Sequence, residues 1–361
     1  MNPDIDSKIY EDELIYFEEV FTVLRAYKTF CLQKIHKAQV SLDLLSPKHK
    51  ALVEALSTNY DAFRNGVIVN EAFFSRIVED VGSMFLKSNP LTDSYAKVKQ
   101  AEEFQLPSAA KMEDLLITLR HLVREWSQLG AAERDSSFTP ILKQIVSNFP
   151  DDRNNVKILV PGCGLGRLPF EIARLSYECQ GNQPNPYMLF AANYITNNCI
   201  SANSITVHPW VTDNCNQWSH EDRCKSISVP DINPRNHVLG TYSMVAGDFL
   251  EVYTEENEFD CVVCCFYLDT TLNMIERLDR IFQILRPGGC LINLSPRFSF
   301  NVVEEDSLHI TYEHMISIVE KIGFDITFHN EDLICTYSGT KGVNTRNTLN
   351  APLFVARKPI V

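Results

Sequence analysis

A glycine-rich turn lies between an apolar run and a helical pattern in the segment KILVPGCGLGRLPFEIA, residues 157–173. Residues 156–160 are predicted to form a strand, and residues 168–176 the helix that follows it. Gly162 and Gly164 permit backbone angles that other residues resist, and they remove side chains that would block a ligand. The helix N-terminus presents free N–H groups. We therefore expect a strand–turn–helix unit of a mostly parallel sheet, with a ligand site at the turn.

The spacing of the glycines separates two classes of ligand. The dinucleotide fingerprint G-x-G-x-x-G brings a helix end onto a pyrophosphate. Here the third glycine, Gly166, comes one residue earlier and Arg167 follows it. This spacing suits a ligand without a pyrophosphate that lies flat over the loop, as S-adenosylmethionine does. A nucleotide ligand and a purely structural turn stay open on this pattern alone.

After Pro150, short apolar runs alternate with helical segments, which is typical of βαβ units. Further strands are expected at residues 177–180, 243–246, 261–267, 290–294, 325–328 and 353–357. Helices are expected among them at residues 185–198, 272–285 and 312–322. The predicted fold class is α/β, a Rossmann-like seven-stranded sheet of the class I methyltransferase type with a helical N-terminal region.

The N-terminal part of the chain is predicted to be helical, because apolar residues recur there at three-to-four spacing. Helices are expected at residues 11–38, 48–56, 72–85, 112–127 and 140–149. The expected division is a helical region at residues 1–150 and a Rossmann-like methyltransferase domain at residues 151–361. Residues 203–236, rich in Asn, Asp, Pro and Trp, are expected to form an irregular insertion in that domain.

The chain of 361 residues carries a net charge of −13. A bulk-acidic surface repels nucleic-acid backbones and anionic membranes, so neither is expected as a partner. No stretch approaches the ~20 apolar residues of a membrane span, and the polar, acidic N-terminus lacks the features of a secretory signal. Several of the 11 cysteines lie in apolar runs. They predict buried, reduced thiols in a cytoplasmic or nuclear protein.

Three of these cysteines, Cys261, Cys264 and Cys265, resemble a CxxC metal motif superficially. They lie on an expected strand, and no second Cys/His pair with ligand spacing follows them. The 9 histidines show no ligand-like spacing either. No metal is therefore expected.

A second ligand signal follows the strand expected at residues 243–246, where Gly247 leads into Asp248 and Phe249. The Asp248 carboxylate can accept a hydrogen bond from the exocyclic amine of an adenine, and the Phe249 ring can cover the base. A strand-ending turn in which Asp248 caps a helix is the alternative. LRPGG at residues 285–289 is expected to be a helix stop and turn that leads to a further strand. The order of these parts favours a methyl-donor site.

Longer segments carry a family resemblance. VREWSQLG, GCGLGRLPFEIA, ECQGN, CFYLDTTLN and LRPGGCLINLSP, found in this order between residues 123 and 296, resemble the carnosine N-methyltransferase family, and the similarity extends over nearly the whole chain. The resemblance implies an enzyme that uses S-adenosylmethionine to methylate an imidazole nitrogen of the dipeptide carnosine, giving anserine. It also implies a homodimer formed through the helical N-terminal region.

Carried over by position, the resemblance assigns site residues. The implied cofactor contacts are Arg124, Gly162, Gln183, Asp248, Phe249 and Cys265, with Gly164 from the glycine loop and His121 at the position of a family Gln. The implied acceptor residues are Asp269, which would also be the catalytic residue, and Tyr337.

The chain departs from the family at three positions. Gln183 stands where the family has an acidic residue, and a Gln amide has one acceptor oxygen where a carboxylate could accept from both ribose hydroxyls. Phe300 and Leu349 stand where the family has a His and a Tyr that help to hold the acceptor. Lower cofactor affinity and a more apolar acceptor pocket are expected.

Each of the main site residues also has a structural alternative. Asp269 can be the N-cap of the helix expected after it, and Tyr337 an ordinary half-buried tyrosine. Arg124 can pair on the surface with an acidic neighbour such as Glu125 or Glu133.

Three functions follow from these readings. The first is methyl transfer to an imidazole, whose pKa of about 6.5 leaves most of it neutral, with a free lone pair, at cellular pH. Asp269 would accept the other ring N–H and fix the tautomer. The second is a methyltransferase with a changed acceptor, such as a protein histidine or another small molecule. The third is a cofactor-binding module without turnover.

Overall fold

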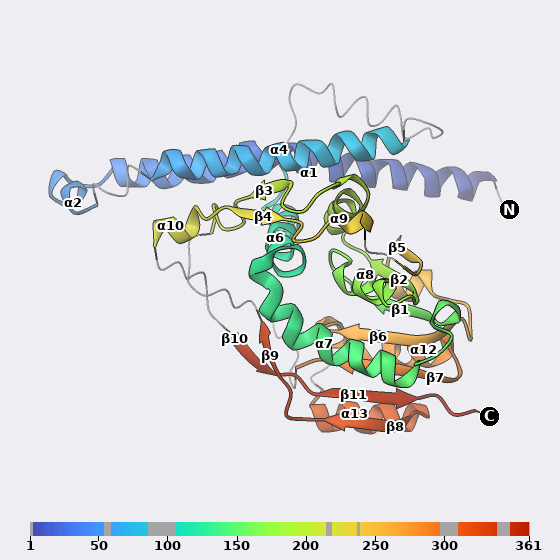
Figure 1. The fold of residues 1–361 in the computed structure, drawn as a ribbon. Helices are drawn as coiled ribbons and strands as arrows, with labels where there is room; N and C mark the ends of the chain where they lie inside the picture. The colour runs from blue at the N-terminus through green and yellow to red at the C-terminus, as the bar shows by residue number, and fades with distance from the viewer. Residues whose placement is uncertain are drawn as a thin grey trace. The chain divides into compact units, whose positions relative to one another are not determined.

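The computed structural model describes residues 3–53, 59–85, 106–213, 219–236, 239–296, 310–337 and 347–360 (Figure 1). These residues form two compact units. Residues up to 123 and residues 186–232 belong to the first, and residues 124–185 with most of 233–360 to the second. The first unit thus ends its N-terminal segment at residue 123, not at the boundary expected at residue 150, and it includes residues 186–232 from beyond that boundary. The domain division at residue 150 stays a prediction.

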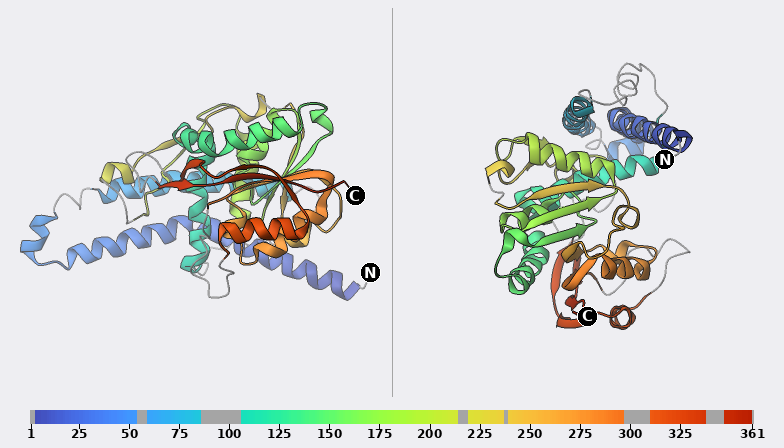
Figure 2. Two further views of the ribbon diagram at one scale, coloured as in Figure 1. Left: turned by 90° about the horizontal axis from the view of Figure 1, so that it is seen from below. Right: turned by 90° about the vertical axis from the view of Figure 1, so that its right-hand side faces the viewer.

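The first unit is built mainly from helices: α1 (Pro3–Asp43), α2 (Pro47–Leu52), α4 (Tyr60–Phe85), most of α6 (Ala109–Trp126), α9 (Pro186–Asn198) and α10 (His220–Arg223). Helices α1 and α4 lie side by side (Figures 1 and 2). The region expected to be irregular contains a short antiparallel pair, β3 (Ile205–Val207) and β4 (Ile227–Val229). Within the described residues, no helix has the length and apolar character to cross a membrane.

A buried asparagine attaches the β3 segment to the helices of this unit. The Nδ2 atom of Asn70 on α4 donates to the Tyr27 hydroxyl at 2.8 Å and to the carbonyl oxygen of His208 at 2.9 Å. Its Oδ1 atom accepts from the backbone amide of His208 at 2.7 Å. Asn70 is fully buried, and these bonds remove the penalty of burying its amide.

The second unit contains the predicted seven-stranded sheet, in the order β5-β2-β1-β6-β7-β11-β8. Its strands are β1 (Lys157–Pro161), β2 (Glu178–Gln183), β5 (Tyr242–Ala246), β6 (Phe259–Cys265), β7 (Leu285–Leu294), β8 (Asp325–Asn330) and β11 (Leu353–Arg357). The first five strands of that order are parallel, and β11 runs antiparallel to both of its neighbours. The α/β fold class with a helical N-terminal region is confirmed.

Helices cover both faces of this sheet (Figure 2). On one face α7 (Ala131–Asn148) and α8 (Arg167–Arg174) pack on the side chains of Ile158 and Val160. On the other face α11 (Phe249–Val252), α12 (Met274–Ile284) and α13 (Tyr312–Ile322) pack around Leu159. A sheet buried on both faces explains the continuous apolar runs of its central strands.

Several element boundaries differ from the sequence-based expectation. Helix α4 begins at Tyr60, whereas a helix was expected only from residue 72, and two further differences lie in the second unit. Helix α7 begins at Ala131 and carries Pro140 in its interior, whereas the proline was expected to open the helix. Strand β7 begins at Leu285 and includes the LRPGG segment, which was expected to be a turn. This segment is held by Lys358, whose carbonyl oxygen accepts from the Gly288 amide at 2.8 Å. A contact between residues so distant in sequence leaves no local signal.

A two-stranded hairpin lies outside the main sheet. It pairs β9 (Ile334–Tyr337) with β10 (Asn347–Asn350) in antiparallel register, so that Leu349 stands opposite Cys335. Cys335 is buried, and its thiol lies 3.3 Å from the carbonyl oxygen of Ser136 on α7. The hairpin therefore packs on α7 through the face that carries Cys335 and Leu349.

Candidate active site

The glycine turn after β1 has the backbone geometry that its sequence predicts. Gly162, Gly164 and Gly166 have φ angles of +60°, +59° and +74°, in the region that favours glycine. A Cβ atom on Gly162 would lie 2.5 Å from the Tyr267 ring. Gly162 is half-buried, whereas residues 163–169 are buried. Gly162 is therefore the least buried residue of this turn.

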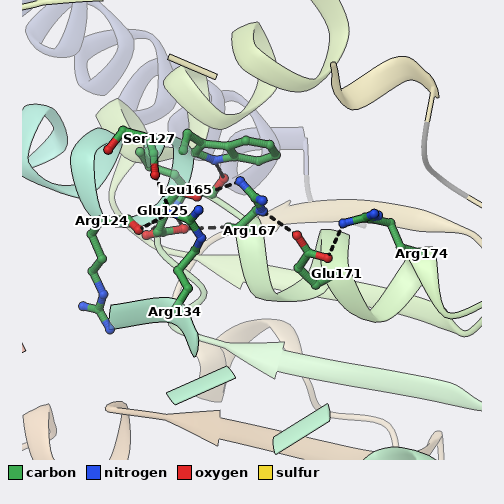
Figure 3. A network of polar contacts seen from close by, with 9 residues as sticks. Arg124, Glu125, Ser127, Arg134, Leu165, Arg167, Glu171 and Arg174 are labelled. Carbon is green, nitrogen blue, oxygen red and sulfur yellow. Dashed lines mark hydrogen bonds and ion pairs between the residues drawn. The ribbon is translucent and has the colours of Figure 1, made fainter. Parts of the chain in front are cut away.

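A buried carboxylate from the end of α6 holds the turn (Figure 3). Glu125, only 4% exposed, accepts hydrogen bonds from the Leu165 amide at 2.9 and 3.0 Å and from the Arg167 amide at 3.2 Å. The sequence-based alternative that placed Glu125 on the surface as a partner of Arg124 is wrong. A cap that joins residues 40 positions apart has no local sequence pattern.

Trp126 and Arg167 complete this contact. The Trp126 indole N–H donates to the Leu165 carbonyl oxygen at 3.0 Å, and the Arg167 guanidinium lies 4.8 Å from the Trp126 ring centroid. Arg167 also donates to the backbone oxygen of Glu125 at 2.9 Å and forms an ion pair with Glu171 at 2.7 Å (Figure 3). The last turn of α6 and the first turn of α8 thus enclose the glycine turn.

Gln183 reaches the turn from the end of β2. Its Nε2 donates to the Gly164 carbonyl oxygen at 3.3 Å, and its Oε1 accepts from the Asn185 amide at 2.9 Å. The neighbouring Asn182 donates to the Gly247 carbonyl oxygen at 3.0 Å. The ends of β1, β2 and β5 therefore meet at one edge of the sheet, where a ligand binds in open α/β folds.

Asp248 lies at that edge and caps α11. Its carboxylate accepts from the Leu250 amide at 2.8 Å and pairs with Arg277 at 3.1 Å. Burial alone would raise the Asp248 pKa, but the Leu250 amide and the Arg277 guanidinium outweigh it and hold the pKa below its usual value. The alternative interpretation, in which Asp248 caps a helix, is confirmed. The Asp248 side chain remains 41% exposed, which leaves it accessible to a ligand.

Phe249 and Tyr267 pack together beside Asp248. Phe249 is 1% exposed, and its ring centroid lies 6.0 Å from that of Tyr267. Arg277 donates to the Tyr267 hydroxyl at 2.6 Å, so Arg277 links the turn after β6 to Asp248. Tyr267 was not singled out by the sequence analysis, although it lies within the motif CFYLDTTLN that carries the family resemblance.

Asp269 lies after β6 in a short 3-10 turn (Leu268–Thr270) and is 2% exposed. Burial raises its pKa to about 7, although its own backbone amide and the charge of Arg124 act in the opposite direction. The N-cap of α12 is Asn273, whose side chain accepts from the Glu276 amide. The alternative that Asp269 caps this helix is therefore wrong.

Arg124 faces the same region from α6. It forms an ion pair with Glu133 at 3.1 Å, and its guanidinium lies 5.5 Å from the Phe266 ring centroid. Both side chains of this pair are largely buried, so the pairing expected with Glu133 is present but is not on the surface. Phe266 has a φ angle of +52°, a conformation that costs about 1–3 kcal/mol and is concentrated at functional sites.

The thiol next to this turn is not ionised. Burial, followed by the opposing charge of Arg124, sets the Cys265 pKa at about 12. Cys265 can therefore contact a ligand as a neutral group. The described cysteines form no disulfide. No group of three or more His, Cys, Asp or Glu side chains in the described parts of the chain is placed to hold a metal ion.

The remaining predicted residues are placed as follows. Leu349 is half-buried on β10, and Tyr337 ends β9 on the same hairpin. His121 lies on α6 one turn before Arg124 and belongs to the first compact unit. Phe300 lies outside the described residues.

A doubly wound sheet with this strand order, a glycine turn after its first strand and acidic side chains at its carboxyl edge defines a Rossmann-like S-adenosylmethionine-dependent methyltransferase. The chain belongs to the carnosine N-methyltransferase family, whose sequence profile matches residues 101–360.

Curated relatives agree with this assignment. The chain is 35% identical to a mouse (Mus musculus) carnosine N-methyltransferase over 95% of this chain and 86% of the relative. It is 30% identical to the Drosophila melanogaster protein over 99% of this chain and 84% of that protein. A Methanosarcina mazei S-adenosylmethionine-dependent methyltransferase is 16% identical, with a TM-score of 0.41, over 60% of this chain and 98% of that structure.

Proposed function

We propose that this protein transfers the methyl group of S-adenosylmethionine to an imidazole ring nitrogen of carnosine. The observation that carries the proposal is Asp269, a buried carboxyl with a pKa of about 7 in the turn that follows β6. Strand β6 pairs with β1, which leads into the glycine turn. Family membership supplies the reaction class.

The glycine turn fits the proposed donor. Gly162 is half-buried and has a φ angle of +60°, and Asp248, which follows β5, has an accessible carboxylate. The residues proposed to hold the donor are His121, Arg124, Gly162, Gly164, Gln183, Asp248, Phe249 and Cys265. S-adenosylmethionine, when bound, supplies a methyl group already activated on a sulfonium.

Asp269 would act on the acceptor. An ionised Asp269 accepts the N–H of a neutral imidazole, which selects the tautomer whose lone pair lies on the other ring nitrogen. When that nitrogen is methylated, the ring becomes cationic and more acidic at the N–H that Asp269 holds. Asp269 then accepts this proton, and the neutral methylated ring is released. A carboxyl with a pKa of about 7 is suited to both roles near neutral pH.

The acceptor end of the site carries two of the three departures from the family, Phe300 and Leu349. Leu349 is half-buried on the hairpin face that packs on α7, where the family resemblance implies a tyrosine. Tyr337 and Phe300 are proposed as further acceptor residues. Because Leu349 cannot hydrogen-bond a peptide, a different imidazole-bearing acceptor, such as a protein histidine, is the second candidate.

Transfer of labelled methyl from S-adenosylmethionine tests these functions directly. Carnosine, histidine-containing peptides and other small imidazoles are offered separately, and the labelled product is identified by mass spectrometry. Labelled carnosine is the expected result. Label found only on another acceptor would favour the second candidate. No transfer to any acceptor, with measurable binding of S-adenosylhomocysteine, would show a cofactor-binding module.

Asp269→Ala should abolish transfer and leave the affinity for S-adenosylhomocysteine unchanged within a factor of about two. Asp260→Asn is the matched control, because Asp260 lies at the start of β6, the strand that Asp269 follows, and pairs with Arg286 at 2.8 Å. This control should retain transfer. Equal loss of transfer and cofactor binding in Asp269→Ala would contradict the acceptor role.

The compartment and the oligomeric state belong to the same proposal. The free cysteines among the described residues fit a reducing compartment, and we place the protein in the cytoplasm or nucleus. A homodimer is proposed from the family resemblance.

A further inference from the structure

The first amides of α8 stand where Rossmann-like proteins bind a phosphate. In the dinucleotide fold, the N–H groups that follow the glycine turn point at the pyrophosphate, and the helix dipole favours its charge. In this chain the Leu165 and Arg167 amides point instead at the Glu125 carboxylate (Figure 3). A carboxylate of the protein itself therefore receives hydrogen bonds that a phosphate would receive from amides in this position.

We propose that Glu125 determines the cofactor specificity of the glycine turn by filling its anion site, so that ligands bearing a pyrophosphate are refused. The proposal rests on the proposed use of S-adenosylmethionine, a donor without phosphate. Any pyrophosphate at this turn would have to displace a carboxylate that is 4% exposed and accepts bonds from two backbone amides.

Other contacts keep Glu125 in this position. The Trp126 indole holds the Leu165 carbonyl oxygen, and the Arg167 guanidinium holds the backbone oxygen of Glu125 itself. The Arg167 side chain is directed by Glu171, with which it forms an ion pair at 2.7 Å. Trp126 therefore holds the turn at Leu165, and Arg167 holds the backbone of Glu125 next to the same turn.

The same arrangement explains where the turn stays open. The Gly164 carbonyl oxygen accepts from Gln183, and the Cys163 amide donates to the Asn182 carbonyl oxygen at 3.1 Å. The amides of Leu165 and Arg167 are also hydrogen-bonded. We therefore infer that a ligand reaches the turn at Gly162, which is half-buried. A donor that lies over Gly162 does not compete with Glu125, whereas a pyrophosphate on the helix terminus does.

Isothermal titration calorimetry with S-adenosylhomocysteine, ADP and inorganic pyrophosphate tests the proposal on the full chain. Wild type, Glu125→Ala and Glu125→Ser are compared. Serine is included because its hydroxyl can satisfy one amide while leaving room for an anion. Asp260→Asn is the matched control, because Asp260 also accepts from a backbone amide, that of Lys157 at 2.8 Å, but at the start of β1 and away from the amides of the turn.

Wild type and Asp260→Asn are expected to show no pyrophosphate binding at millimolar concentration. Glu125→Ala and Glu125→Ser are expected to bind pyrophosphate and ADP at least about tenfold more tightly than wild type, with pyrophosphate competing against S-adenosylhomocysteine. If Glu125→Ala does not fold, the serine variant and a thermal shift with pyrophosphate give the same comparison.

Pyrophosphate binding by wild type as tight as that of the variants would overturn the proposal. So would the absence of any gain in both variants, because Glu125 would then serve the fold alone. Failure of wild type to bind S-adenosylhomocysteine would contradict the proposed function instead. The two failures are therefore distinguishable.

Discussion

The indole N–H of Trp126 donates to the carbonyl oxygen of Leu165 at 3.0 Å, and both groups are buried. Trp126→Phe keeps most of the ring but leaves this carbonyl oxygen unpaired, which costs about 1–3 kcal/mol of unfolding free energy. The same change should weaken the binding of S-adenosylhomocysteine, because the turn loses one of the hydrogen bonds that hold its backbone in place. Urea unfolding and calorimetry measure the two effects. Unchanged stability would show that the hydrogen bond contributes nothing.

Gly162→Ala should abolish cofactor binding. Alanine at a φ of +60° is strained by about 1–2 kcal/mol, and its Cβ would meet the Tyr267 ring at 2.5 Å. Gly288→Ala is the matched control, because Gly288 has a φ of +81° but only the end of the flexible Ile360 side chain nearby, at 3.3 Å. The control should lose stability and keep its affinity for S-adenosylhomocysteine. Equal losses of affinity in the two variants would argue against a special role for Gly162.

Asp269 should make the protein less stable as the pH rises. Its folded-state pKa of about 7 lies above the unfolded value of about 3.9, so the folded protein binds more protons between these values. Stability therefore falls from about pH 4 to pH 7, by an amount on the order of 4 kcal/mol. Asp269→Asn removes the ionisation, and its melting temperature should exceed that of wild type at pH 8 by more than at pH 5. A constant difference across this range would refute the raised pKa.

Arg124→Gln should shift the pH dependence of methyl transfer. The positive charge of Arg124 opposes the rise of the Asp269 pKa, so its removal raises that pKa further. In the pH profile of kcat/KM, the limb that reports the ionisation of Asp269 in the free enzyme should move to higher pH by up to about one unit. The limb from the imidazole of the acceptor, at about pH 6.5, should not move. A lower but unshifted profile would mean that Arg124 acts on the donor alone.

Arg277→Gln should reduce cofactor affinity and lower stability mainly above pH 4. The Asp248 pKa is held below its usual value in the folded state, so the stabilisation is present above the unfolded pKa and is lost as the pH falls through the folded pKa. Arg280→Gln is the control on the same helix, because Arg280 bonds only to the Tyr253 carbonyl oxygen among the contacts described, at 2.9 Å. The difference between the two variants should shrink at pH 3.

The local pattern of the sequence predicted the parts of this fold that local interactions determine. The glycine turn, helix α13 at Tyr312–Ile322 and strand β11 at Leu353–Arg357 lie where they were expected. The N-cap of α12 shows the limit of such reasoning. Both Asp269 and Asn273 suit the position by residue type, and the structure assigns it to Asn273.

The missed features depend on residues distant in the chain. Glu125 reaches the turn at Leu165, and Cys335 on the unexpected hairpin reaches Ser136, across 199 positions. The burial of Glu125 was also unexpected from its residue type, because glutamate is rarely buried unless it has partners. Its partners are backbone amides of a turn, which no side-chain pattern reveals. The individual site residues stay predictions.

The hairpin of β9 and β10 has a consequence for how this family diversifies. Leu349 lies on a two-stranded element separate from the sheet that carries the glycine turn. Under the roles proposed above, substitutions on that hairpin would alter which acceptor is recognised without disturbing the glycine turn proposed to hold the methyl donor. Acceptor preference and donor affinity are thereby free to evolve at different rates within one polypeptide.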